Sequence, residues 1–252
     1  MVNALATETS LPMMLNLAPA KRVMVFAPHP DDECIGCGGA LALLAQNPEV
    51  QISVVLVTNG DGGEHSPDVN MGPRRLLEMQ AALKVLGVSE LKTMGRLDGR
   101  FELDDQFETE AQQLLQAFQP NWVFLPGPMD YHKDHLLVSK GVESACKLVG
   151  SVEQLVYFET WTPLPATHVL DITSVMDLKC RALQAHHSAL TYGDYERGVK
   201  GLNAYRGLYL GFDRFAEAFV VQTRAEFENP SSWLTQLKGL GLSLKSRLGA
   251  RT

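Results

Sequence analysis

The sequence lacks several features that mark membrane, secreted and nucleic-acid-binding proteins. No apolar run reaches the roughly 18 residues that a membrane-spanning helix requires, and the first 22 residues have no basic segment ahead of an apolar one, as a signal peptide would. Asp and Glu (29) outnumber Lys and Arg (22), and the net charge of −7 gives no general attraction to nucleic-acid phosphates. We therefore expect a cytoplasmic protein with no transmembrane segment and no nucleic-acid partner.

Cysteine is also scarce. Four cysteines in 252 residues are too few and too scattered for a disulfide framework. Cys34 and Cys37 form a C-x-x-C pair, which is either a redox pair or two small side chains in a tight turn between a strand and a helix. Because no second pair completes a zinc knuckle, we favour the structural interpretation and a reducing compartment.

What the sequence does contain is an alternation of short apolar strands with helices. Strands that read as buried on both faces are expected at 22–27, 51–57 and 121–127, and further strands at 154–160 and 167–173. Helices are expected at 38–46, 73–86, 105–119, 134–149 and 174–190. We predict a single α/β domain over residues 1–228, in which 1–20 form a loose leader. Its sheet should be doubly wound, mostly parallel and Rossmann-like, with helices on both faces.

Residues 229–252 differ from this domain. They contain no acid, carry several lysines and arginines, and repeat leucine at helical spacing. Such a basic amphipathic tail either docks on the body or on a neighbouring subunit, or makes a weak contact with an anionic membrane surface. We favour docking; the sequence leaves both a monomer and a homo-oligomer open.

Two turns rich in acids and histidine each follow a predicted buried strand. They read "APHPDDE" (27–33) and "GPMDYHKDH" (127–135). Because parallel strands end at the same edge of a sheet, we expect the two turns to lie together. Crowded carboxylates would normally raise each other's pKa and lower stability, whereas a divalent cation favours their charged forms. The pair of turns therefore predicts a metal site.

A hydrolytic zinc site usually has three His, Asp or Glu ligands and one bound water. His29 and Asp32 are close enough in the first turn to share an ion, and the third ligand is His135 or His132 from the second turn. Asp31, next to a ligand, could take a proton from the water. Each of these residues alone is an ordinary turn or helix-capping residue; their occurrence in two matched turns favours the metal site.

The chain resembles the PIG-L/LmbE-like zinc de-N-acetylases. "PHPDDE" (28–33) is similar to the family's AHPDDE, and "HKDH" (132–135) to its HPDH. Further similar segments are "TNGDGG" (58–63), "RRLLEMQAALKVLG" (74–87), "LDGR" (97–100), "DIT" (171–173) and "EAF" (217–219). Pro28 and Lys133 depart from the two main motifs without removing a ligand. Ala189 replaces a family Gln, while His186 matches.

The resemblance implies a role for each matched residue. His29, Asp32 and His135 would bind one zinc ion, for which Fe²⁺ is the alternative. Asp31 would be the general base, and His132, as an imidazolium, would stabilise the oxyanion.

The resemblance also implies a substrate, because Arg75 and Asp98 would hold a sugar and its hydroxyls. The expected activity is a zinc-dependent amidohydrolase that removes the N-acetyl group from an N-acetylglucosamine-type amino sugar or its conjugate.

Other functions remain open at this point. One is a zinc amidase acting on a non-sugar N-acyl conjugate, and another is a zinc phosphoesterase, although two-metal phosphoesterases need more ligands than these turns supply. A noncatalytic metal site would give Asp31 and His132 no role. A dinucleotide site is disfavoured, because "GCGGA" (36–40) does not fit the G-x-G-x-x-G spacing.

Overall fold

The computed structural model of the chain describes residues 11–62, 68 and 70–229. The first half of the expected leader (1–20) and all of the expected tail (229–252) except Asn229 lie outside these residues. In the described half of the leader, β1 (Met13–Met14) pairs in parallel with a strand of the main sheet. No helix among the described residues is long and apolar enough to cross a membrane.

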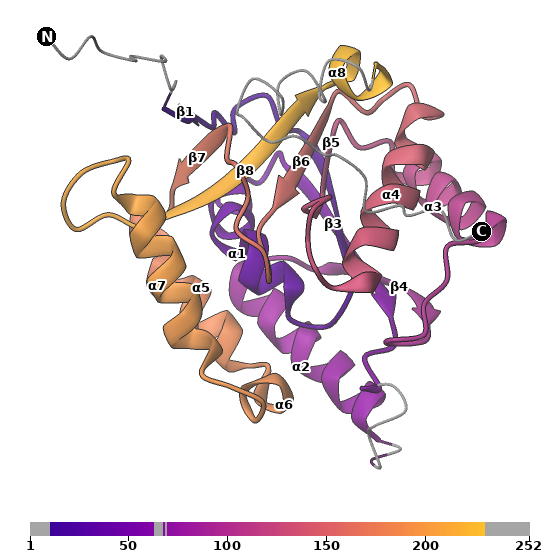
Figure 1. Cartoon of the computed structure of the whole chain (residues 1–252), viewed down its shortest axis with the longest axis horizontal. Coiled ribbons are helices and arrows are strands. Elements are labelled where there is room, and N and C mark those ends of the chain that lie inside the picture. Colours follow the sequence, from indigo (N-terminus) through magenta and orange to yellow (C-terminus); the bar gives the residue numbers. More distant parts are fainter. Residues whose placement is uncertain (1–10, 63–67, 69, 230–252) are drawn as a thin grey trace, which may run out of the picture.

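One sheet of eight strands forms the centre of the described part of the chain (Figure 1). Besides β1, its strands are β2 (Arg22–Ala27), β3 (Gln51–Thr58), β4 (Glu90–Arg96), β5 (Trp122–Pro126), β6 (Gln154–Phe158), β7 (His168–Asp171) and β8 (Ala216–Thr223). Their order is β1-β7-β8-β6-β5-β2-β3-β4. Only β8 runs antiparallel to its neighbours. The predicted mostly parallel α/β sheet is therefore confirmed.

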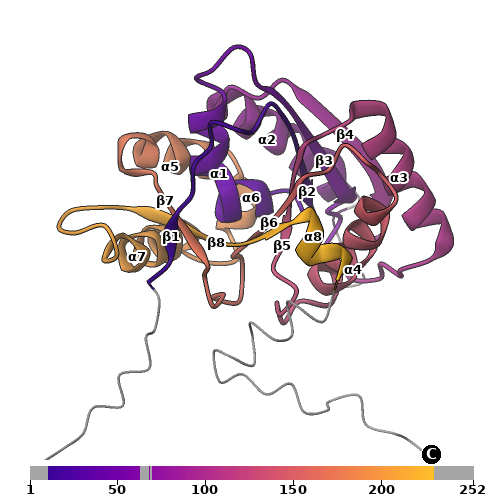
Figure 2. The same cartoon turned by 90° about the horizontal axis from the view of Figure 1, so that it is seen from above.

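Helices cover both faces of this sheet. They are α1 (Asp32–Leu44), α2 (Met71–Leu86), α3 (Asp105–Phe118), α4 (Lys133–Lys147), α5 (Met176–Gln184), α6 (His187–Leu190), α7 (Tyr195–Gly207) and α8 (Arg224–Glu228). Alternate residues of β2 enter two separate apolar clusters: Val23 and Val25 pack with α1, α2 and α5, whereas Met24 and Phe26 pack with α3 and α4. Since successive side chains of a strand point to opposite faces, the two helix groups lie on opposite sides of the sheet (Figure 2).

The strand order places a switch point between β2 and β5. From β2 the chain moves outward to β3 and β4, and then crosses to β5 on the other side of β2. The turns after β2 and after β5 therefore leave the sheet next to each other, at the carboxyl ends of the strands. Ligand sites of open α/β sheets form at such points.

Glu217 of β8 anchors α1 where that helix is irregular. Cys37 has non-helical backbone angles (φ −141°, ψ 20°), so α1 restarts after it. The Glu217 carboxylate accepts hydrogen bonds from the N–H groups of Gly39 (2.7 Å) and Ala40 (2.8 Å), and the Lys179 ammonium donates to it over 2.7 Å. Both charged side chains are buried. This ion pair ties α1 and α5 to the sheet.

Several elements differ from the sequence prediction. The single helix expected at 174–190 is wrong, because α5 ends at Gln184 and α6 begins only at His187. His186, between them, turns inward and its side chain is buried. The helix α1 begins at Asp32, ahead of the expected start. The strands β4 and β8 and the helix α7 were not predicted.

Candidate active site

Two turns at the switch point bring the predicted metal ligands together. The first connects β2 to α1, and the second connects β5 to α4. His29 Nδ1 lies 3.2 Å from Asp32 Oδ2 and 3.2 Å from His135 Nε2, and the last two atoms are 3.1 Å apart. All three side chains are buried. Two imidazole nitrogens and one carboxylate oxygen therefore form a nearly equilateral triangle.

This triangle has the size of one face of a tetrahedral metal site. Zinc bonds to nitrogen and oxygen are about 2.0–2.2 Å long, so neighbouring ligand atoms of a tetrahedral zinc are about 3.4 Å apart. The donor set of two imidazoles and one carboxylate is one that zinc and Fe²⁺ accept. The residues present therefore fit a single divalent ion.

The far nitrogen of each imidazole ring has its own acceptor. His29 Nε2 lies 3.1 Å from Asp134 Oδ2 and 3.2 Å from Asp98 Oδ1. His135 Nδ1 lies 2.9 Å from Thr160 Oγ1, whose hydroxyl donates to Asp130 Oδ2 over 2.7 Å. A hydrogen on each far nitrogen directs the lone pair of the other nitrogen into the triangle. Metal-binding histidines have this arrangement.

The charges around the triangle favour a cation. Burial alone would raise the pKa of Asp32, but the positive charges and hydrogen bonds of His135 and His29 hold it well below its ordinary value. Burial alone would lower the pKa of His135, yet the Asp32 charge and hydrogen bonds to Asp130 and Asp32 raise it to about 9. The carboxylates around the two imidazoles therefore attract positive charge to this point.

Asp31 lies beside the triangle in a strained conformation. Its φ of 134° is unusual for a residue other than glycine. Its N–H donates to Glu33 Oε2 (3.1 Å), and its Oδ2 accepts a hydrogen bond from Arg75 Nη2 (3.3 Å). Burial and the neighbouring Asp32 charge raise the pKa of Asp31 to about 7, against the opposing charge of Arg75. These properties suit a group that exchanges a proton near neutral pH.

His132 caps the start of α4 and borders the same space. Its ring centroid is 4.7 Å from that of His29 and 4.8 Å from that of His135. Its Nδ1 accepts a hydrogen bond from the Asp134 N–H (3.3 Å), which leaves Nε2 to carry the hydrogen of a neutral ring. Burial and the charges of His29 and His135 lower the pKa of His132. An accepting Nδ1 is compatible with a neutral imidazole, and the imidazolium implied by the resemblance stays a prediction.

Arg75 and Asp98 lie at the site but bind its own loops. Arg75 Nη2 donates to the Pro30 carbonyl (2.9 Å) as well as to Asp31, and Arg75 Nη1 lies 3.6 Å from Asp98 Oδ2. Asp98 contacts His29 and accepts a hydrogen bond from the Gly62 N–H (3.1 Å). These contacts give both residues a structural role at the site.

Sequence analysis did not assign Asp130 and Asp134, the acceptors behind the imidazoles. Both belong to the "DYHKDH" turn. Asp134 is fully buried, and its Oδ1 has no hydrogen-bond partner among the described residues. The sequence did hold a signal for both residues, because Asp130 and Asp134 lie on either side of His132 in a turn that already supplies a predicted ligand.

A second buried group, Glu33 and His186, lies directly behind Asp31. His186 Nε2 is 2.8 Å from Glu33 Oε1, and the Cys34 thiol donates to the same oxygen over 3.3 Å. Glu33, Cys34 and His186 are metal-binding residue types within reach of one another. However, burial and the Glu33 charge raise the pKa of the Cys34 thiol, and burial also raises that of Cys37. A redox or thiolate role for the C-x-x-C pair is therefore disfavoured.

Comparison with known proteins gives relatives of the same kind. Diacetylchitobiose deacetylase from Thermococcus kodakarensis is 26% identical over 238 residues, covering 78% of this chain and 87% of the relative. The structure of N,N'-diacetylchitobiose deacetylase from Pyrococcus horikoshii matches 83% of this chain and 86% of its own, with a TM-score of 0.74 and 22% identity. GalB, the 4-carboxy-2-hydroxymuconate hydratase from Pseudomonas putida, matches 80% and 95%, with a TM-score of 0.69 and 23% identity. The two structural matches show likeness of fold.

The family comparison covers the part of the chain that builds the site. Residues 24–146 match PIG-L, described as GlcNAc-PI de-N-acetylase. This span runs from β2 to α4 and includes both turns. It confirms the family expected from the motifs and, with the relatives, the prediction of a hydrolase of the N-deacetylase type. Over residues 24–146, just under half of its length, the chain matches the PIG-L family of de-N-acetylases.

Proposed function

We propose that this protein is a zinc-dependent N-deacetylase that removes the acetyl group from an N-acetylglucosamine-type amino sugar or its conjugate. The observation that carries the proposal is the triangle of His29 Nδ1, Asp32 Oδ2 and His135 Nε2, with sides of 3.1–3.2 Å. We assign these residues as the ligands of one divalent ion. A zinc ion held there supplies a water of lowered pKa and polarises the amide carbonyl.

Asp31 and His132 are the proposed catalytic residues. Asp31 takes a proton from the attacking water, whose oxygen bonds to the acyl carbon, and returns the proton to nitrogen as the carbon–nitrogen bond breaks. Burial and the neighbouring Asp32 charge raise the pKa of Asp31 above its ordinary value, which favours its taking up a proton. Arg75 holds the Asp31 carboxylate in place. His132 donates its Nε2 hydrogen to the amide oxygen as negative charge develops there. The products are acetate and a primary amine.

The substrate class rests on the relatives. Their names include a diacetylchitobiose deacetylase and a probable N-acetyl-alpha-D-glucosaminyl L-malate deacetylase, so an N-acetylated amino sugar is the favoured class here. Arg75 and Asp98 are the proposed contacts to the sugar hydroxyls. The likeness to GalB means that the fold alone does not fix the reaction. The four buried, free cysteines favour a reducing, cytoplasmic compartment, and the β2/β5 switch point supports the doubly wound description of the sheet.

Joint measurement of metal content and acetate release tests the proposal. The full chain, loaded with zinc, is incubated with N-acetylglucosamine and its glycosides, with and without a chelator, and acetate and new primary amine are quantified. We expect Asp31→Asn to keep one zinc per chain and to lose about 10²–10⁴-fold in kcat. Asn has nearly the same size and shape as Asp, so the turn should be preserved.

Asp177→Asn, an exposed substitution on α5, is the matched control and should leave both quantities unchanged. A near-normal rate for Asp31→Asn would contradict the assignment of the base. Absence of acetate release from every glycoside by a zinc-loaded protein would contradict the proposed function.

A further inference from the structure

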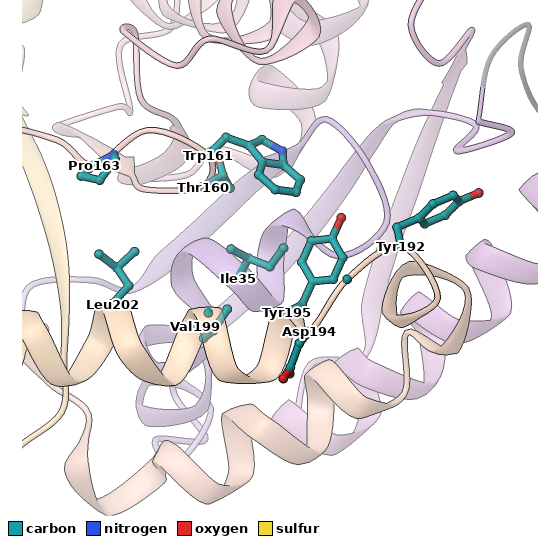
Figure 3. Close-up of a pocket in the computed structure, with 11 residues that line it drawn as sticks. Ile35, Thr160, Trp161, Pro163, Tyr192, Asp194, Tyr195, Val199 and Leu202 are labelled. Carbon is teal, nitrogen blue, oxygen red and sulfur yellow. The ribbon is translucent and has the colours of Figure 1, made fainter.

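A cavity of about 460 Å³ opens beside the candidate active site (Figure 3). Its walls come from α1, from the loop after β6, and from the segment that ends in α7. The lining residues are Ile35, Thr160, Trp161, Pro163, Tyr192, Gly193, Asp194, Tyr195, Gly198, Val199 and Leu202. Apart from Thr160, which accepts from His135, none of them has a role in the reaction proposed above.

Two residues of the cavity wall also contact residues of the candidate active site. Thr160 lines it and also contacts the ring of His135, with 2.9 Å between Thr160 Oγ1 and His135 Nδ1. Ile35 lines it from the first turn of α1, where its N–H donates to the Asp31 carbonyl over 2.9 Å. One molecule could therefore reach both the triangle and the cavity.

The cavity walls are mainly apolar and aromatic. Figure 3 shows the aliphatic side chains of Val199 and Leu202 along α7, and the Trp161 ring close to that of Tyr195. The Trp161 and Tyr195 rings meet edge to face, with centroids 5.5 Å apart. Trp161 is 42% exposed and Tyr192 is 67% exposed, so a large aromatic surface is left in contact with water at this opening. Small-molecule sites have this composition.

Two polar groups of the walls are already bound within the protein. The Thr160 hydroxyl donates to Asp130, and Asp194 Oδ1 accepts a hydrogen bond from the Arg197 N–H at the start of α7. Most of the other polar groups belong to the aromatic rings of Trp161, Tyr192 and Tyr195, and the remaining lining side chains are mainly aliphatic. An alkyl or aryl group, which needs no hydrogen bonds, matches these walls better than a second sugar ring does.

We propose that this cavity binds an apolar aglycone, an alkyl or aryl group attached to the amino sugar. The inference rests on the proposed function, in which the acyl group removed is acetyl. An acetyl methyl group is about the size of a water molecule, roughly 30 Å³, and would fill only a small part of the space. The large apolar volume is therefore assigned to the other end of the substrate.

Deacetylation of a series of N-acetylglucosamine glycosides tests this assignment. With the zinc-loaded full chain, kcat/KM is measured for the methyl, hexyl, octyl and phenyl glycosides of both anomers and for diacetylchitobiose. Burial of each methylene is worth about fourfold, so we expect the octyl glycoside of the accepted anomer to exceed the methyl glycoside by at least 30-fold. Diacetylchitobiose, whose second ring is polar, should resemble the methyl glycoside.

A substitution in the cavity wall provides the matched variants. Leu202→Glu should lower kcat/KM for the octyl glycoside at least tenfold and leave that for the methyl glycoside unchanged. Leu208→Glu, at the exposed end of α7, is the control and should change neither. Trp161→Ala, which removes the opposite wall, should repeat the selective loss if Leu202→Glu does not fold.

Binding of the reaction products separates this inference from the proposed function. By calorimetry, octyl glucosaminide should bind at least 30-fold more tightly than methyl glucosaminide, and Leu202→Glu should remove the difference. If octyl glucosaminide binds tightly but no glycoside releases acetate, the proposed function fails and the cavity assignment stands. Equal binding of the two amines, preference for diacetylchitobiose, or preference for an N-octanoyl over an N-acetyl substrate would overturn the assignment.

Discussion

His29 and His135 lie 106 positions apart in the chain, yet His29 Nδ1 is 3.2 Å from His135 Nε2. Two imidazole nitrogens share at most one hydrogen at this separation, whereas a metal ion accepts both lone pairs. The contacts behind each ring fix which nitrogen faces the other. The orientation of the two imidazole rings therefore depends on residues outside the ligand set, and substitution of those residues can measure the effect on metal binding.

Asp134→Asn should weaken zinc binding while leaving all three proposed ligands in place. The Asp134 carboxylate accepts from His29 Nε2 and from the Gly99 N–H (2.8 Å), so it fixes the orientation of the ring. Loss of such an outer contact typically lowers metal affinity 10–100-fold. Competition against a chelator of known affinity measures the change, with Asp105→Asn on the exposed start of α3 as the control. Unchanged affinity would mean that Asp134 does not orient His29.

Glu217→Leu should destabilise the fold without touching the metal centre. Among the described residues, the substitution leaves the fully buried Lys179 ammonium with only the Ile35 carbonyl as a partner (3.0 Å). Breaking a buried ion pair in this way costs about 3–5 kcal/mol of unfolding free energy, which urea denaturation would measure.

The double variant Lys179→Met/Glu217→Leu should recover part of this loss, because no unpaired charge remains. Glu102→Leu, an exposed control, should change the free energy of unfolding by less than about 0.5 kcal/mol. A double variant as unstable as Glu217→Leu would argue that the two backbone hydrogen bonds of Glu217, rather than its charge pairing, carry the effect.

The contribution of His186 to stability should fall as pH rises. Burial alone would lower the pKa of His186, but the charge and hydrogen bond of Glu33 raise it above 6.5. Since the folded pKa exceeds the unfolded value, the stabilisation is fully present below about pH 6.5 and is lost as pH rises through the folded pKa.

Urea denaturation of metal-free wild type and His186→Gln between pH 5.5 and 9 tests this expectation. The stability difference between the two proteins should shrink with increasing pH. A difference that grows with pH would mean that His186 is neutral in the fold.

The cysteines should be unreactive until the protein unfolds. All four are buried and free, and burial raises the pKa of each thiol. Thiolates are the reactive form, so a disulfide reagent should label less than about a tenth of the thiols in the native protein within minutes. Four thiols per chain should appear in denaturant. Rapid labelling of two native thiols would instead support the redox interpretation of Cys34 and Cys37.

Much of the fold follows from sequence patterns that have a direct physical cause. β2 and β5 are apolar runs because both their faces are covered, and parallel pairing brings their following turns together. The less regular elements escape such patterns. β4 includes Lys92 and Arg96 because it is an edge strand, and α7 contains Gly198 and Gly201, which weaken its intrinsic helix signal.

The candidate site also has residues that the sequence predicts and residues that it does not. Residue types and spacing indicated His29 and Asp32 and left the third ligand open between His135 and His132, while the family resemblance favoured His135. The structure brings the donor atoms of His29, Asp32 and His135 together. Spacing could not show that Asp32 is a ligand whereas Asp134 lies behind the His29 ring. The direction of the backbone within each turn decides which carboxylate faces the ion. The break at His186 was also hidden, because its cause is a contact with Glu33, 153 residues away in the sequence.

X-ray absorption spectroscopy of the protein loaded with one equivalent of zinc tests the central claim most directly. The account predicts a first shell of nitrogen and oxygen at about 2.0–2.2 Å that contains two imidazoles, and loss of one imidazole in His135→Gln. A sulfur neighbour at about 2.3 Å would place the zinc at Glu33, Cys34 and His186 instead. That result, or a shell without histidine, would contradict the proposed metal centre.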